Sequence, residues 1–433
     1  MAAVQTPAVP QDFTTPIKNG LNGVAQPSEA LEGNFPASWY TQQGFYEFER
    51  RAIFSKQWLL MTHRIRLPEP GSFLRFELAG FDFFLIKDKK NEIHAFHNIC
   101  RHRAYPIIED KDGRQGKKSI LSCGYHGWSY SLSVNLAKAP KFEEVEGFKK
   151  EDYSLFSIHT HVDKTGFIWV NLDASNNPIS WEEMNGGTDE QPRYNDFNID
   201  SYVYERTWIT NGKYNWKLVG ENYNECYHCT ASHPGIRKIT NLDRYAVEPK
   251  KGRMEHTPPN RDDIKPEDVK FFGNGAFTFN YPNTSVNFST PYFFIMRVVP
   301  KTATTVTTEY EVYRNPESDI ETFNKAAEFF EGIELEDYDL MNGVQANLNN
   351  NVFVNGPLHK ARESGIFAFK RLVQKHLQEH REIEAAMGCQ VHPARRNQQL
   401  YKTISDEEKF CGDVCACRDA SQSASNGTNS VRA

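Results

Sequence analysis

Residues 97–107 read HNICRHRAYPI and residues 122–130 read SCGYHGWSY. The first stretch carries Cys100 and His102, and the second carries Cys123 and His126. Each stretch therefore offers one thiolate and one imidazole, whereas a zinc finger usually combines a Cys pair with a His pair. Two such loops can place both sulfurs on one iron and both imidazoles on another. The pattern indicates a two-iron centre, and the alternatives are a structural zinc site or four unrelated residues.

This set of ligands is that of a Rieske [2Fe–2S] cluster. The sequence resembles the Rieske family, and the HGW that ends the second motif strengthens the resemblance. The resemblance implies that the cluster is held by Cys100, His102, Cys123 and His126. Two features depart from the family pattern: Ala104 stands where Gly is usual, and the charged segment at 109–118 lengthens the spacer. We expect Trp128 and Tyr130 to cover the cluster loops.

The regions around these motifs predict two domains of an α+β fold. Helical spacing of apolar residues predicts a helix over 45–58, and short alternating runs at 72–80, 81–88, 92–99 and 163–173 predict a small all-β domain. Beyond a boundary near residue 178, a helical stretch at 215–229, strands between 277 and 313, and a helix over 320–348 predict an antiparallel sheet covered by helices, in a helix-grip-like arrangement. We expect a disordered arm over 1–35, a Rieske domain over 36–178, a catalytic domain over 179–405 and a disordered tail over 406–433.

The second motif is NWKLVGENYNECYHCTASHPGI, residues 215–236. Glu225 and His228 are three residues apart, so on a helix they share a face. His233 converges with His228 only if the helix ends first, and Pro234 favours such an end. The two imidazoles can then bind one metal, although a helix-end cluster without metal is an alternative.

Two histidines and one carboxylate leave positions open on iron(II) for dioxygen and substrate. The late helix carries an apolar stripe of Leu340, Met341, Val344 and Leu348. Asp337 projects near the centre of this stripe, a costly place for a carboxylate without a compensating charge. Glu336 and Asp339 are predicted to point away from that stripe, and Glu334 falls nearer its margin. A solvated helix charge is the alternative for Asp337.

This second region resembles the catalytic domain of the Rieske oxygenases. The resemblance implies that His228, His233 and Asp337 bind a mononuclear iron. It further implies that Glu225 is a catalytic acid bridging that iron to the Rieske histidine of a neighbouring subunit. Cys226 and Cys229 invite a zinc interpretation, but we expect small buried fillers, because a zinc site competes for His228. Asn222 lies either near the open iron position or in helix packing.

The resemblance implies a terminal oxygenase working as a homotrimer or a multiple of it. No GxGxxG element follows a strand and no plant-type ferredoxin motif occurs, so a separate NAD(P)H-dependent reductase of flavin or ferredoxin type is expected. Aromatic residues of the later strands predict walls that suit a flat ring or a quaternary ammonium. These residues are Phe277, Phe279, Tyr281, Phe288, Tyr292, Phe293 and Phe294, of which at most about half can face one side.

We favour monooxygenation of a small amine (a quaternary ammonium) or a natural-product-like molecule, because ENYNECYHC resembles the choline, carnitine and betaine oxidising branch. The alternatives are ring hydroxylation and an electron-transfer protein with an inactive second domain. The 433 residues carry a formal charge of −6, which gives no reason to bind nucleic acid. We also expect no membrane span and a cytoplasmic, reducing location.

Overall fold

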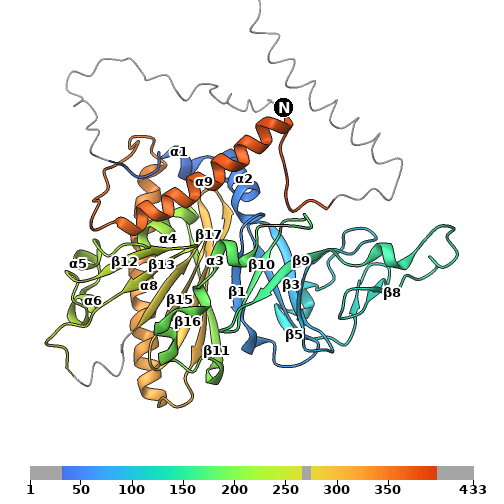
Figure 1. Ribbon diagram of the computed structural model, residues 1–433, viewed down its shortest axis with the longest axis horizontal. Helices are drawn as coiled ribbons and strands as arrows, with labels where there is room; N and C mark the ends of the chain where they lie inside the picture. Colours follow the sequence, from blue (N-terminus) through green and yellow to red (C-terminus); the bar gives the residue numbers. More distant parts are fainter. Residues whose placement is uncertain (1–31, 266–274, 397–433) are drawn as a thin grey trace, which may run out of the picture.

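The computed structural model describes residues 32–265 and 275–396, which form two antiparallel sheets and the helices around them (Figure 1). The predicted disordered tail lies outside the described residues, as do residues 1–31 of the predicted arm. The folded part begins earlier than predicted, because Phe35 is already buried and its ring stacks on Trp39.

The first domain is built on a seven-stranded sheet with the order β1-β10-β9-β4-β3-β2-β5. Its strands form where the sequence predicts them, and they are rich in Phe, Ile and Leu, but they are buried at more consecutive residues than an alternating pattern implies. A separate three-stranded sheet, β6-β7-β8, lies at one end of the molecule (Figure 1). The strands are β1 (Leu59–His63), β2 (Ser72–Leu78), β3 (Phe81–Lys87), β4 (Ile93–His97), β5 (Gln115–Lys117), β6 (Leu121–Ser122), β7 (Ser129–Tyr130), β8 (Leu136–Lys138), β9 (Ser157–Val162) and β10 (Phe167–Asn171).

The second domain is a seven-stranded antiparallel sheet with the order β11-β17-β16-β15-β14-β13-β12. Strand β16 is buried along most of its length, whereas the edge strand β11 is exposed at alternate residues. The strands are β11 (Val203–Gly212), β12 (Ala246–Lys250), β13 (Arg253–Thr257), β14 (Ala276–Asn280), β15 (Thr284–Phe288), β16 (Tyr292–Thr302) and β17 (Thr305–Arg314).

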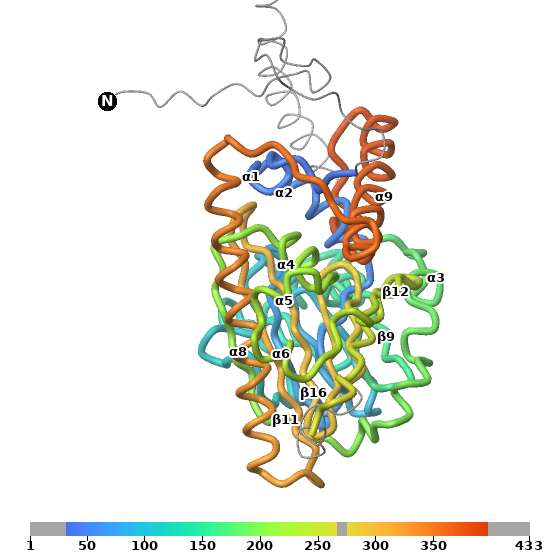
Figure 2. Tube along the Cα trace, turned by 90° about the vertical axis from the view of Figure 1, so that its left-hand side faces the viewer, coloured from blue at the N-terminus to red at the C-terminus, as the bar shows by residue number. Residues whose placement is uncertain are grey.

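Two long helices cover this sheet, α8 (Ile320–Leu348) and α9 (Ser364–Met387) (Figures 1 and 2). The Asp319 side chain caps α8 by accepting a hydrogen bond from the Thr322 amide at 2.8 Å. The shorter helices are α1 (Ser38–Thr41), α2 (Gln43–Glu49), α3 (Trp181–Asn185), α4 (Trp216–Tyr223), α5 (Cys229–Ser232) and α6 (Pro234–Ile239). The predicted helix over 45–58 is α2 followed by a turn of π-helix, η1 (Arg50–Phe54). Short 3-10 helices η2 (Arg64–Arg66), η3 (Asp110–Asp112), η4 (Lys150–Tyr153), η5 (Thr188–Glu190), η6 (Pro192–Asp196) and η7 (Ile199–Ser201) lie in the connections.

One hydrophobic core runs through both domains. It joins residues of the first sheet, such as Trp169, to residues of the second, such as Ile295. The N-terminal helices also belong to it: the Trp216 indole donates to Glu49 at 2.8 Å, and Phe54 packs edge-on against the same indole. A second, smaller core surrounds Cys100 and Cys123. The two cysteine loops thus have their own packed support.

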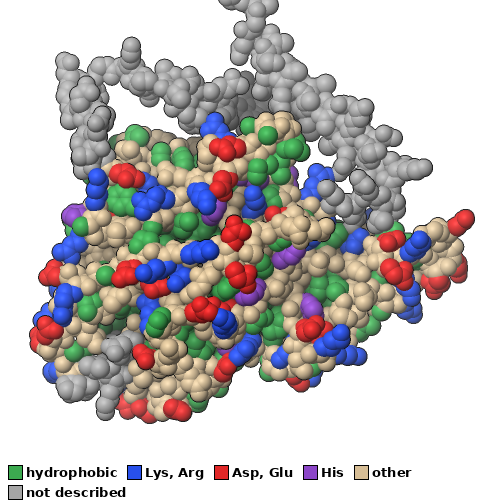
Figure 3. Space-filling model, in the orientation of Figure 1, with side chains coloured by type: hydrophobic (Ala, Val, Ile, Leu, Met, Phe, Trp, Pro, Cys, Tyr) green, Lys and Arg blue, Asp and Glu red, His purple; other side chains and the backbone are tan. Residues whose placement is uncertain are grey.

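The face drawn in Figure 3 carries interspersed acidic and basic side chains. None of the described helices combines the length and the apolar character that a bilayer span requires.

Candidate metal centres and substrate cavity

The two cysteine loops at the end of the first domain fold into the same turn. The Cys100 amide donates to the Tyr105 carbonyl at 2.8 Å, and the Ala104 amide donates back to the Cys100 carbonyl at 3.0 Å. In the second loop the equivalent hydrogen bonds join Cys123 to the Trp128 carbonyl and Gly127 to the Cys123 carbonyl, at 2.8 and 3.1 Å. The backbone therefore forms an equivalent turn at each cysteine, with its histidine two residues after Cys100 and three residues after Cys123.

The side chains of these loops are suited to hold a cluster. Cys100 and Cys123 are buried, and the rings of His102 and His126 lie with their centroids 4.5 Å apart. His102 Nδ1 is buried and finds no hydrogen-bond partner among the described residues, which is costly unless the nitrogen serves as a ligand. Burial, followed by the charge of His126, lowers the pKa of His102 and so favours the neutral, ligating form.

Trp128 and Tyr130 do more than cover the loops. The Trp128 ring stacks on His102, with centroids 5.1 Å apart and an interplanar angle of 8°. The Tyr130 hydroxyl lies 3.4 Å from Cys100 Sγ and accepts a hydrogen bond from the Arg101 amide. Tyr130 is thereby oriented to donate to a thiolate.

The second motif folds differently from the single helix that its spacing predicts. Helix α4 ends at Tyr223, so Glu225 and His228 lie in the irregular turn between α4 and α5 instead of on one helical face. The predicted break before Pro234 is present, because α5 ends at Ser232 and α6 begins at Pro234. His233 stands between the two helices and is buried.

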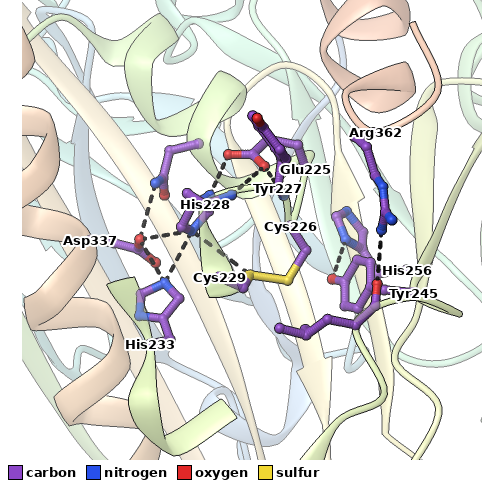
Figure 4. The surroundings of a disulfide bond; sticks show 12 residues. Glu225, Cys226, Tyr227, His228, Cys229, His233, Tyr245, His256, Asp337 and Arg362 are labelled. Atoms are coloured by element: carbon purple, nitrogen blue, oxygen red, sulfur yellow. Dashed lines mark hydrogen bonds and ion pairs between the residues drawn. A yellow bond between two sulfur atoms is a disulfide. The ribbon is translucent and has the colours of Figure 1, made fainter. Parts of the chain in front are cut away.

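His228, His233 and Asp337 converge between this segment and α8 (Figure 4). The two Nε2 atoms are 3.0 Å apart, and Asp337 Oδ1 lies 3.3 Å from His228 Nε2 and 3.1 Å from His233 Nε2. Two ligands about 2.1 Å from a metal and at a right angle to each other are about 3.0 Å apart. The three atoms therefore fit one face of an octahedron around a single ion.

Carboxylates fix both imidazoles from behind. Glu225 accepts from His228 Nδ1, and Glu336 Oε2 lies 2.7 Å from His233 Nδ1. With Nδ1 bonded to its carboxylate, each Nε2 is able to offer its lone pair to a metal in the centre, as metal-binding histidines require. Glu336 was predicted to point off the apolar stripe of α8. Its side chain is 42% exposed, yet its carboxylate still reaches His233 Nδ1.

The electrostatics of the triad favour a cation. Burial acts to lower the pKa of His228, but hydrogen bonds to Asp337 and Glu225 outweigh it and raise that pKa to about 10. Burial likewise opposes ionisation of Asp337, yet hydrogen bonds from the two histidines lower its pKa to about 2. Asn222 donates to Asp337 Oδ1 at 3.0 Å, which assigns the asparagine to holding the carboxylate.

Cys226 and Cys229 form a disulfide and are not the separate buried fillers that the sequence predicts (Figure 4). Their Cα atoms are 5.0 Å apart, a normal separation for such a bond. Cys229 Sγ lies 3.9 Å from His228 Nε2, but a disulfide sulfur offers no thiolate to a metal. Disulfides are uncommon in reducing compartments, so the bond contrasts with the expected setting.

A cavity of about 120 Å³ opens beside the triad. Of the seven aromatic residues predicted to form its walls, Phe277 and Phe294 do so, and Tyr292 lines an adjoining hollow. The others pack within the core. Glu334, predicted near the margin of the apolar stripe, also lines the cavity, together with Tyr223, Tyr245 and Phe330, which no sequence pattern singled out.

Comparison with known proteins agrees with this architecture. Residues 57–149 match the Rieske [2Fe-2S] domain, and residues 199–379 match the ring hydroxylating alpha subunit (catalytic domain). The chain belongs to the Rieske non-heme iron oxygenases, oxidoreductases that use a Rieske cluster and a mononuclear iron.

Within that class the chain is similar to oxygenases named for quaternary amines. The carnitine monooxygenase oxygenase subunit of Acinetobacter pittii is 26% identical over 362 residues, covering 79% of this chain and 94% of the relative. That of Escherichia coli (strain K12) is 30% identical over 239 residues, covering 54% of this chain and only 59% of the relative. The chloroplastic choline monooxygenase of Spinacia oleracea is 26% identical, covering 79% of this chain and 78% of the relative.

The chain is also similar to solved structures of Rieske oxygenases. The quaternary ammonium Rieske monooxygenase CntA in complex with L-carnitine matches with a TM-score of 0.71 and 25% identity, over 80% of this chain and 96% of that one. Naphthalene 1,2-dioxygenase from Rhodococcus sp. bound to indole matches with a TM-score of 0.64 and 17% identity, over 80% of this chain and 95% of that one. The latter likeness concerns the fold alone.

Proposed function

We propose that this chain is a terminal oxygenase that monooxygenates a small quaternary ammonium compound. Cys100, His102, Cys123 and His126 hold the Rieske cluster, and His228, His233 and Asp337 hold the mononuclear iron. The cluster supplies electrons and the iron, when bound, supplies the site of dioxygen activation. Glu225 orients His228 and is the acid on the path between the two centres.

The observation that carries the proposed substrate class is the cavity beside the triad. Its volume of about 120 Å³ is below the roughly 300–1,000 Å³ of pockets for drug-sized ligands, so the substrate is small. Aromatic side chains and carboxylates share its lining, a combination that attracts a cation without requiring N–H donors. The similar carnitine and choline monooxygenases are named for substrates of this kind.

We propose further that the active assembly is a homotrimer or a multiple of it, supplied by a separate NAD(P)H-dependent reductase. The small sheet β6-β7-β8, which flanks the cysteine loops, lies at the opposite end of the molecule from α5 and α6, which flank the triad (Figure 1). His126 and Tyr125 of the second cysteine loop are exposed. A neighbouring subunit can therefore place its exposed second cysteine loop next to Glu225 of this subunit's triad.

The first test is to isolate the protein without oxygen, count its iron and measure oxygen uptake with a surrogate reductase. We expect three irons per chain, a Rieske spectrum, and uptake stimulated by choline, carnitine or betaine. Asp337→Ala should retain two irons and the spectrum but lose the stimulated uptake. Stimulation by arenes and not by quaternary amines would instead establish ring hydroxylation.

A complementation experiment tests the assembly. His102→Ala removes a proposed cluster ligand, and Asp337→Ala removes a proposed iron ligand, so each variant alone should be inactive. Coexpressed subunits should regain activity if electrons cross between neighbours, because some interfaces pair an intact cluster with an intact triad. Continued inactivity of mixed oligomers with normal metal contents would show transfer within one chain.

A further inference from the structure

We propose that Glu334 recognises the positive charge of the substrate and so sets a preference for cations over neutral molecules of the same shape. This inference rests on the proposed function, because it presumes a quaternary ammonium in the cavity. It assigns the residue to substrate selection and not to the metal.

Glu334 occupies the position on α8 from which it can face a bound substrate. It precedes Asp337 by three residues, so both carboxylates project from the same side of the helix. Both line the cavity that contains His228 and His233. The structure shows hydrogen bonds from the histidines to Asp337, but none from them to Glu334. Glu334 thus forms part of the wall beside the triad.

The carboxylate of Glu334 is held in place from the sheet. The Tyr310 hydroxyl, on β17, donates to Glu334 Oε2 at 3.0 Å. Tyr310 is itself fixed by Trp208, since the two rings stack with centroids 3.8 Å apart and an interplanar angle of 5°. Such support keeps the carboxyl group oriented before the ligand arrives.

Glu334 also lacks the counter-charge that neighbouring carboxylates have. Glu225, Glu336 and Asp337 each contact a histidine, whereas no Lys, Arg or His among the described residues forms an ion pair with Glu334. Burial, reinforced by the charge of Asp337, raises the pKa of Glu334 to about 8. At neutral pH this half-buried carboxyl is therefore mostly protonated in the empty cavity, and a cation bound there stabilises its ionised form.

The cavity walls next to Glu334 suit a quaternary ammonium. Phe294 and Phe330 line both the main cavity and the adjoining hollow, and Glu334 does the same. Their ring centroids are 6.3 Å apart. A quaternary ammonium has no N–H to donate, so it is recognised through aromatic faces and through charge. Phe294 and Phe330 provide the aromatic faces, and Glu334 provides the charge.

The test compares choline with its neutral carbon isostere, 3,3-dimethylbutan-1-ol, by calorimetric binding to the iron-loaded holoenzyme. Glu334→Gln keeps the shape and the ability to accept from Tyr310 but removes the charge. We expect its affinity for choline to fall about 10–100-fold and its affinity for the neutral alcohol to change less than about 3-fold. Glu328→Gln, an exposed residue on the same helix, is the matched control and should bind like the wild type.

Tyr310→Phe is a second variant that leaves the charge in place but frees its orientation. It should weaken choline binding less than Glu334→Gln does, again with little effect on the alcohol. Equal losses of both ligands, or an unchanged preference for choline in Glu334→Gln, would overturn the role of Glu334 while leaving the substrate class intact. A wild-type protein that binds the alcohol as well as choline would overturn both proposals.

Discussion

Ala104 occupies in the first cysteine loop the place that Gly127 occupies in the second. Each lies four residues after its cysteine, donates its amide to that cysteine's carbonyl, and has a positive φ, 56° for Ala104 and 73° for Gly127. A left-handed conformation costs an L-residue roughly 1–2 kcal/mol and costs glycine little. The departure from the family pattern at residue 104 therefore carries backbone strain.

Ala104→Gly should relieve that strain. We expect the loop to gain about 1 kcal/mol, less the greater freedom of glycine in the unfolded chain, and the cluster to be lost more slowly in guanidinium. The loss is followed as bleaching of the visible absorbance. Gly127→Ala is the matched opposite change and should speed bleaching. Faster bleaching of Ala104→Gly than of the wild type would contradict the inference that the backbone is strained at Ala104.

Tyr130→Phe should lower the reduction potential of the cluster. A hydroxyl that donates to Cys100 Sγ stabilises the reduced, more negative state, and its loss favours oxidation. A hydrogen bond worth about 1 kcal/mol corresponds to roughly 40 mV for one electron, so a fall of about 20–60 mV is expected in a spectroscopic redox titration. Tyr105→Phe, whose hydroxyl contacts Glu109, is the control. An unchanged potential in Tyr130→Phe would show that the sulfur accepts nothing from this hydroxyl.

Glu336→Ala should weaken iron binding at the triad without affecting the cluster. The carboxylate holds His233 Nδ1 at 2.7 Å, and loss of such a supporting contact typically costs about 10–100-fold in metal affinity. Titration of iron-depleted triads with ferrous ion measures the change. Asp339→Ala removes an exposed charge from the same helix and should bind iron normally. Equal affinities of the two variants for ferrous ion would show that Glu336 does not support iron binding.

The sequence predicted α8 from Ile320 to Leu348 but only part of its buried face. In the apolar stripe used to orient the helix, Met341 and Leu348 are buried, whereas Leu340 and Val344 are exposed. The side that faces the site instead carries Glu334 and Asp337. Periodicity identifies the face that a helix buries in an apolar core, whereas a face turned toward a polar site carries no apolar signal.

At the metal centres, too, local patterns could be predicted from the sequence, whereas long-range contacts could not. Cys–His spacing reports local chain geometry, so the residues of each cysteine loop could be paired from sequence. Contacts such as Glu336 with His233, or Tyr310 with Glu334, join residues 103 and 24 positions apart. They depend on how α8 packs on the sheet, which no local pattern encodes. The Cys226–Cys229 bond was missed because its sulfurs meet only in the irregular turn after α4.

His256 makes the stability of the catalytic domain depend on pH. It is buried behind the cavity, where Tyr245 Oη lies 2.8 Å from its Nδ1 and Asn224 Oδ1 lies 3.2 Å from its Nε2. Burial, followed by the charge of Arg193, lowers its pKa to about 3. Because an unfolded histidine titrates near 6.5, the unfolded state takes up a proton first as the pH falls.

The contribution of His256 to stability is therefore fully present above pH 6.5 and is lost as the pH falls toward 3. Between pH 6 and 4 the loss is about 1.4 kcal/mol per pH unit. His256→Gln should be less stable than the wild type at pH 7.5, because it loses a hydrogen bond, and the gap should narrow at pH 5. Denaturant unfolding of anaerobic protein measures this, with the exposed His359→Gln as control. A gap that stays constant or widens at pH 5 would mean that His256 takes up its proton in the folded state as readily as in the unfolded one.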